Sequence, residues 1–309
     1  MRKYIITAIL AAAFHIGGHA QETAMSFLRL PVDPATAAMG GADMLNTNTT
    51  AYSAFGNAAA GVFSAKTMDV AASYQMWSPK TFRNSFINAG ASYKIGGQLL
   101  VSAGMTMGSN PEYDMYDENG ESAGTFKPKD MGVGLGVAYK LVDILAVGAN
   151  FKYASSTLAQ GHGYNAVAAD LMLMAKLPVG FKAAAGVRSL GSSVKAADGT
   201  SFALPSSVAA GVGFEAKSLK HKIDADVDFD YYLKDGVAAS VGAYYSYDDM
   251  VTVRAGYHYG GKTVVPSFLS AGIGAGYSGV RLDISYVMFT GDVTDFIKNT
   301  ITFGLGYSF

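Results

Sequence analysis

The chain contains no cysteine among its 309 residues. Disulfide bridges, thiolate metal sites and cysteine nucleophiles are therefore excluded. Charged residues are also scarce, at 15% of the chain, and the net charge is -1. This balance gives no electrostatic reason to expect binding to nucleic acid. Beyond the first twenty residues there is no run of about 18 apolar residues, so we expect no membrane-spanning helix there.

The first twenty residues have the pattern of an export signal. Two basic residues precede an apolar run at positions 5 to 14, and Gly18 and Ala20 are the small residues that a signal peptidase requires. We therefore predict a signal peptide at residues 1 to 20, cleaved before Gln21. The alternative, a membrane anchor, is disfavoured because the apolar run is too short to span a bilayer.

Apolar residues make up 50% of the chain, and after about residue 66 they alternate with small or polar residues. Residues 221 to 232, HKIDADVDFDYY, carry Asp224, Asp226, Asp228 and Asp230 at every second position. Side chains on a strand alternate between two faces, and a strand between lipid and a polar interior shows this pattern. About fourteen such segments are predicted, each long enough to cross the hydrocarbon core. They lie at about 67–77, 82–95, 99–108, 129–140, 145–155, 164–177, 180–189, 205–216, 221–232, 237–247, 250–259, 267–277, 280–289 and 300–309.

The polar face of these segments is mostly glycine, alanine and serine, as at Gly132, Gly134 and Gly136. A water-soluble β-sandwich, the main alternative, usually carries many lysines and glutamates on its solvent face. Small residues on an inward wall leave room for something inside. We therefore predict an all-β fold over residues 66 to 309, a transmembrane antiparallel β-barrel of about fourteen strands.

The four aspartates are predicted to face a water-filled lumen. Basic residues predicted to point inward from other strands would balance them, and these are Lys152, Lys182, Arg188, Arg254 and Arg281. A calcium loop is disfavoured, because an EF-hand counted from Asp224 needs glycine and glutamate where the chain has Phe229 and Asp235. Alternate carboxylates on a strand also lie about 6.6 Å apart, so few could share one ion. We predict no metal site and no cofactor.

Two further features bear on function. The histidines after the predicted cleavage site are His162, His221 and His258, none of them near a recognisable serine signature, so we predict no catalytic residue and no enzyme. The longest connection, residues 110 to 130, is acidic and aromatic. We expect it to be extracellular, either as a partner contact or as an ordinary solvated loop.

Residues 21 to 65 lack alternation but carry short motifs. The segments FLRLP from Phe27 and AAMGGA from Ala37 resemble the opening of mature proteins of the PorV/PorQ family, relatives of the FadL-type fatty-acid transporters of the Bacteroidota. Where that family usually has Asn-Pro-Ala-Gly, this chain has NAAAG from Asn57. The segment GVRSLG from Gly186 looks like the family's strand that ends in a Leu-Gly pair.

This resemblance implies a fourteen-stranded barrel with residues 21 to 65 folded into the lumen as a hatch. The hatch or ligand contacts would come from Phe27, Leu30, Met39, Gly40, Gly41 and Asn57. The implied location is the outer membrane, in contact with its lipid, and the implied role is accessory to type IX secretion with other secretion proteins as partners.

Two alternatives remain open: FadL-like transport of a hydrophobic small molecule that leaves through the barrel wall, and a structural subunit of another outer-membrane complex. A transporter should have an apolar pocket between hatch and wall, whereas a secretion partner should have none.

Overall fold

The computed structural model describes residues 23–77, 84–116, 122–159, 162–195, 199–260, 265–290 and 299–309. The predicted signal peptide lies outside the described residues, as do residues 117 to 121 of the long acidic connection. In the part of the chain that is described, no helix is long and apolar enough to cross a bilayer.

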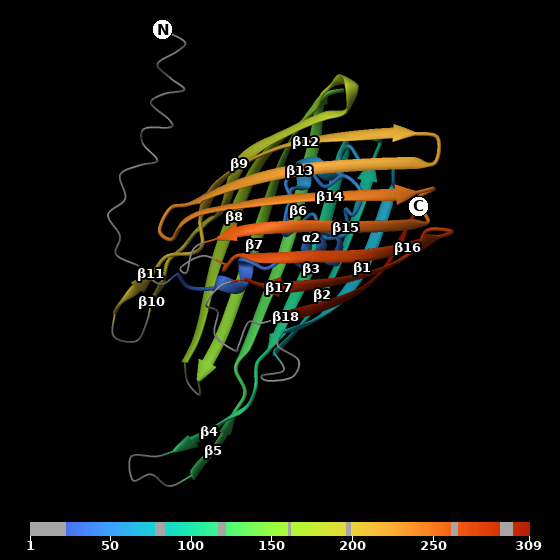
Figure 1. The fold of residues 1–309 in the computed structure, drawn as a ribbon. Coiled ribbons are helices and arrows are strands. Elements are labelled where there is room, and N and C mark those ends of the chain that lie inside the picture. Colours follow the sequence, from blue (N-terminus) through green and yellow to red (C-terminus); the bar gives the residue numbers. More distant parts are fainter. Residues whose placement is uncertain are drawn as a thin grey trace.

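Fourteen antiparallel strands close into one barrel (Figure 1). They are β1 (Met68–Trp77), β2 (Asn84–Ile95), β3 (Leu99–Ser109), β6 (Lys129–Val142), β7 (Leu145–Ala159), β8 (His162–Lys176), β9 (Phe181–Gly191), β12 (Ser207–Ser218), β13 (His221–Tyr232), β14 (Gly236–Tyr247), β15 (Val251–Gly260), β16 (Phe268–Tyr277), β17 (Val280–Phe289) and β18 (Asn299–Ser308). The predicted all-β barrel of about fourteen strands is confirmed, and each predicted segment coincides with one barrel strand.

The other described elements are short. Two hairpins that the alternation did not predict extend from barrel connections, β4–β5 (Tyr113–Tyr116 and Ser122–Phe126) and β10–β11 (Val194–Lys195 and Ser201–Phe202). The helices are η1 (Ser26–Arg29), α2 (Pro34–Ala38), α3 (Ala58–Gly61) and η2 (Pro178–Gly180).

Strand β13 shows how the barrel sorts its side chains. Its apolar residues Ile223, Val227 and Phe229 are 53%, 48% and 46% exposed on the outer surface, whereas Asp224 is fully buried inside. The same alternation runs along the other strands, because successive side chains on a strand point to opposite faces. An outer surface this apolar is suited to lipid.

The two ends of the barrel differ. One end, called here the short-turn end, has connections of only a few residues, such as 143–144, 219–220 and 278–279, and Phe309 lies there beside Met68. The opposite, long-loop end carries the connections 110–128 and 192–206. In outer-membrane barrels short turns are periplasmic and long loops extracellular.

The described N-terminal residues pass from the rim of this cylinder into its interior (Figure 1). Residues 23 to 32, the rim segment, lie at the long-loop end, where Ala24 N donates a hydrogen bond to Ala203 O at 3.0 Å. Residues 33 to 65, the inner segment, cross the lumen and are mostly buried. The expectation of a water-filled lumen is therefore wrong around Asp224, Asp226 and Asp228, which are buried, whereas Asp230 is partly exposed.

Candidate functional site

Local sequence explains the two short helices of the inner segment. Asp33 caps α2 by accepting a hydrogen bond from Ala35 N at 3.0 Å, and Pro34 begins the helix with a backbone angle already suited to it. Asn57 caps α3 in the same way through Ala59 N at 2.9 Å. Its side-chain amide also donates to Met44 O at 2.7 Å, which joins two turns of the inner segment.

The inner segment lies directly on glycines of the barrel wall. A Cβ atom at Gly256 of β15 would lie 2.2 Å from both Met39 C and Gly40 N. Gly40 has a φ of +71°, and a Cβ there would lie 2.6 Å from Tyr257 O. Opposite, a Cβ at Gly90 of β2 would lie 2.3 Å from Ala51 O. The glycine-lined interior therefore lets two backbones approach each other more closely than any side chain would permit.

The aspartates of β13 divide into two kinds of contact. Lys182 Nζ lies 2.7 Å from Asp224 Oδ1 and 2.9 Å from Asp226 Oδ1, and all three side chains are buried. Asp228 Oδ2 instead accepts hydrogen bonds from Asp43 N at 2.8 Å and Met44 N at 2.9 Å. The acidic face of β13 therefore contacts β9, which lies beyond β12, and the inner segment.

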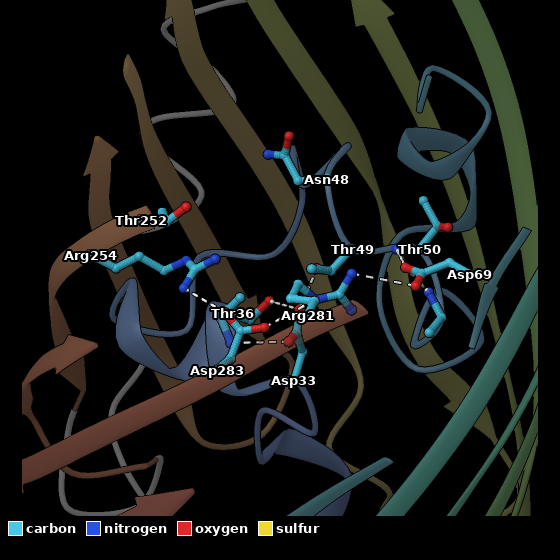
Figure 2. A network of polar contacts seen from close by, with 12 residues as sticks. Asp33, Thr36, Asn48, Thr49, Thr50, Asp69, Thr252, Arg254, Arg281 and Asp283 are labelled. Atoms are coloured by element: carbon cyan, nitrogen blue, oxygen red, sulfur yellow. Dashed lines mark hydrogen bonds and ion pairs between the residues drawn. The ribbon is translucent and has the colours of Figure 1, made fainter. Parts of the chain in front are cut away.

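A second group of charged side chains, called here the charged layer, comes from strands β1, β15 and β17. Figure 2 shows Arg281 between Asp283 and Asp69, with the distances Nε–Oδ2 3.0 Å and NH1–Oδ1 3.4 Å. Arg254 NH1 lies 2.7 Å from Asp283 Oδ1. Asp69 accepts hydrogen bonds from Thr50 N at 2.7 Å and Ala51 N at 3.1 Å. This layer also connects a wall carboxylate to the backbone of the inner segment.

Asp69→Asn is expected to lower the free energy of unfolding by about 1.5 to 3 kcal/mol, because hydrogen bonds to a charged acceptor are worth that much. Faster protease cleavage within the inner segment should accompany this change. Urea unfolding in detergent and limited proteolysis measure both. The control is Asp248→Asn, which removes an exposed carboxylate paired with Lys220 and should cost less than about 1 kcal/mol. Equal effects of the two substitutions on stability and cleavage would show that Asp69 does not anchor the inner segment to the wall.

A cavity of about 110 Å³ lies between the rim segment, the inner segment and the wall. Its apolar lining comes from both segments and from the strands, and includes Phe27, Leu28, Leu30, Pro31, Tyr232 and Phe268. Phe268 stacks on His258 with ring centroids 4.8 Å apart. Phe268 also contacts Phe289 at 5.4 Å, and Phe289 contacts Trp77 at 5.8 Å. The cavity is thus bordered on one side by an aromatic cluster.

Three cationic side chains line the cavity, and each has a carboxylate partner. Arg188 donates to both carboxylate oxygens of Asp43, and its Nε lies 3.7 Å from Asp230 Oδ1. Lys152 Nζ lies 2.6 Å from Asp170 Oδ2. Arg29 pairs with Asp235 and lies 4.5 Å from the centre of the Tyr232 ring.

The barrel wall changes beside the cavity. Strands β9 and β12 pair as far as Arg188 and Ser207. Beyond that point β9 pairs with β8, and the hydroxyl of Ser206 donates to Ser189 O at 2.6 Å. Ser189 has a φ of +50°, and its N–H donates to Asp170 Oδ1 at 2.7 Å, which stabilises a bulge. Ser189, Pro205 and Ser207 all line the cavity, so the cavity reaches the point where these two strands part.

A second cavity, of about 290 Å³, lies at the short-turn end. Lys66, Arg254, Arg281 and Asp283 contribute to its lining, so the charged layer of Figure 2 borders it. Burial lowers the pKa of Lys66, and the nearby Arg281 lowers it further, against the carboxylates of Asp69 and Asp249. The linings of the two cavities have no residue in common.

The structure brings some predicted site residues together and separates others. Those that line the first cavity are Phe27, Leu30, Gly41, Asn57, Lys152 and Asp230. Met39 and Gly40 lie instead against the backbone of β15, and Arg254 and Arg281 line the second cavity. Asp224, Asp226 and Asp228 hold Lys182 and the inner segment.

Sequence reasoning missed the acids of the inner segment, Asp33 and Asp43, and the wall residue Asp69. Asp33 had a signal, since Asp-Pro before a run of good helix formers is typical of a helix start. Asp43 and Asp69 had none, because their partners are remote in sequence. Within the described residues, no group of three His, Cys, Asp or Glu side chains is placed to hold a metal ion.

The fold and the cavity define a class, a closed fourteen-stranded barrel of the outer-membrane type with chain folded inside it. No protein-family model and no curated protein matches the sequence. Among solved structures, the chain is similar to the toluene transporter TodX of Pseudomonas putida, with 14% identity, a TM-score of 0.63 and coverage of 89% of this chain and 97% of that one.

It is also similar to the monoaromatic hydrocarbon channel CymD, with 14% identity, a TM-score of 0.62 and coverage of 91% and 97% of the two chains. A FadL homologue of Pseudomonas aeruginosa shares 11% identity, with a TM-score of 0.56 and coverage of 91% and 99%. At these identities the similarity shows a shared fold alone. The fold is therefore that of FadL-type barrels, whereas the closer resemblance to PorV/PorQ proteins stays a prediction. TodX is named as a transporter and CymD as a channel, and neither is named as an enzyme.

Proposed function

We propose that the protein is an outer-membrane channel that admits small hydrophobic molecules from the cell exterior. The observation that carries this proposal is the cavity between the rim segment, the inner segment and the wall. In another protein an apolar cavity of roughly 150 Å³ binds benzene, so a cavity of about 110 Å³ is of the right order for a small ring or short chain. The fold shared with hydrocarbon channels supports the same role.

The route we propose enters at the long-loop end and leaves through the wall. The inner segment crosses the lumen beneath the cavity and acts as a plug, held by Asp228 and Asp69. The cavity reaches the place where β9 and β12 part, beside Ser189 and Ser207. A molecule that passes there enters the hydrocarbon core of the membrane, which suits an apolar cargo.

The role in type IX secretion stays a prediction. A barrel that serves only to hold exported proteins has no need of a pocket between the plug and the wall, and the presence of that cavity favours transport. A role as a structural subunit of another outer-membrane complex likewise stays a prediction, and no observation among the described residues favours it.

Titration calorimetry of the full-length chain in detergent, with protein-free micelles as the blank, tests ligand binding. We expect saturable binding of small aromatic compounds, and Phe268→Ala is expected to weaken it roughly tenfold, since losing one buried aromatic contact costs about 1.5 kcal/mol or more. The matched control is Phe229→Ala, which removes a phenylalanine that is 46% exposed on the outer surface. Trp77, the single tryptophan, should report binding by a change in fluorescence. If no compound in a panel of apolar compounds shows saturable binding, the proposed channel function is wrong.

A further inference from the structure

Among the described residues that line the first cavity, every cationic side chain already has a carboxylate partner. Arg29, Lys152 and Arg188 line the cavity, together with Asp33, Asp43 and Asp230. Two more carboxylates, those of Asp170 and Asp235, form ion pairs with Lys152 and Arg29. The carboxylates within reach of the lining therefore outnumber the cations.

Arg188 shows the masking most directly. Two hydrogen bonds join its guanidinium to Asp43, a residue of the inner segment, and Asp230 of β13 lies on its remaining side. Asp43 is fixed there by its own backbone, because Asp43 N donates to Asp228 Oδ2 at 2.8 Å. Asp43 thus occupies both terminal nitrogens of the guanidinium, and Asp230 lies beside Nε at 3.7 Å, a distance at which it contributes negative charge rather than a hydrogen bond. The carboxylate of a ligand would have to displace Asp43 to reach the paired donors, and would meet Asp230 beside Nε.

A second observation concerns the polar groups that remain available. Asp33 carries no cation in hydrogen-bond contact, and accepts instead from Ala35 N, Thr36, Asn46 and Thr49. The cavity lining also contains the hydroxyls of Ser53 and Ser207, of which Ser207 donates to Asp230 Oδ1 at 2.9 Å and can still accept a hydrogen bond. These hydroxyls can hydrogen-bond to a neutral polar group, whereas a carboxylate brought beside Asp33 and Asp230 would face unbalanced negative charge in surroundings largely closed to water.

We propose that the cavity selects uncharged ligands, of the size of a single aromatic ring with or without a hydroxyl or carbonyl group, and that Asp43 and Asp230 enforce this selection by masking Arg188. This inference rests on the proposed transport function and specifies its substrate class. It also makes the inner segment a determinant of specificity, because one of the two masking carboxylates belongs to it.

Benzyl alcohol and benzoate test the inference, since they share a ring and differ mainly in charge. Calorimetry on the full wild-type chain is expected to show binding of benzyl alcohol at least about tenfold tighter than that of benzoate, a difference of about 1.4 kcal/mol. The double variant Asp43→Asn, Asp230→Asn is expected to gain benzoate binding about tenfold while retaining benzyl alcohol. Asp248→Asn, at an exposed ion pair outside the first cavity, should leave both affinities unchanged.

The outcomes separate the two proposals. Equal binding of both compounds by the wild type would overturn the charge selection and leave the transport proposal intact. Binding of neither compound, nor of any other apolar compound, would overturn the transport proposal itself. The wild-type comparison needs no variant, so it decides the matter even where the double variant fails to fold. In a folded double variant, unchanged discrimination would show that Asp43 and Asp230 are not the determinants.

Discussion

Lys182→Met is expected to lower the free energy of unfolding by roughly 3 to 5 kcal/mol, the cost of leaving buried charges without their partner. Lys182 Nζ lies between Asp224 and Asp226, and the side chains of all three residues are at most 5% exposed. Asp224 and Asp226 follow Lys182 by 42 and 44 residues in the sequence. Removing the ammonium leaves their two carboxylates close together inside the barrel without a cation. The substitution preserves the length and apolar stem of the side chain, so the loss reports on charge.

Urea unfolding in detergent, followed by the shift in gel mobility of the folded barrel, measures this effect. Lys220→Met is the matched control, because Lys220 pairs with Asp248 but its side chain is 59% exposed. Such an exposed pair contributes less than about 1 kcal/mol. A triple variant that also replaces Asp224 and Asp226 by leucine should recover most of the stability, as buried charge groups replaced together usually do. Similar losses of unfolding free energy for Lys182→Met and Lys220→Met would show that water reaches the ion pairs of Lys182 with the two aspartates.

Gly256→Val is expected to convert a closed barrel into a conducting one. A Cβ atom at this position would lie 2.2 Å from Met39 C and Gly40 N, and the branched valine side chain needs still more space. Barrel strands are held by hydrogen bonds on both sides, so the inner segment rather than β15 must move. Once displaced, it no longer crosses the lumen, and ions can pass along the barrel axis.

Recordings in planar bilayers measure this change as discrete current steps that the wild type lacks. Gly163→Val serves as the control, since a Cβ there would meet only Thr157 Oγ1 at 3.8 Å, an ordinary contact. Folding of each variant is checked by gel mobility. A correctly folded Gly256→Val barrel without current would contradict the plug role of the inner segment.

Much of the barrel could be predicted because its determinant is local. The alternation in residues 221 to 232 predicts a strand with the bounds that β13 has. Each strand places apolar residues on one face within a window of about ten residues, so the pattern needs no knowledge of the partner strand. The short hairpins β4–β5 and β10–β11 were missed because a few residues outside the lipid carry no such constraint.

The candidate site was less predictable, because its contacts join residues far apart in the sequence. The basic residues Lys182 and Arg188 were expected to face inward, but their partners were not assigned. Arg188 pairs with Asp43, 145 positions away. Asp43 lies in a segment without alternation, where no periodic pattern indicates which way a side chain points. The expected water around Asp224, Asp226 and Asp228 was also wrong, because the inner segment fills the volume that the wall glycines leave open.

The sequence alone determined that the chain forms a barrel with an apolar outer surface and a small, polar inner wall, since the faces of a strand follow from the order of its residues. Only the tertiary structure decided which charges meet, where the inner segment crosses the lumen, and that a cavity remains beneath the rim segment. Those features depend on how fourteen strands close into a ring, which sets the distance between residues that the linear sequence keeps apart.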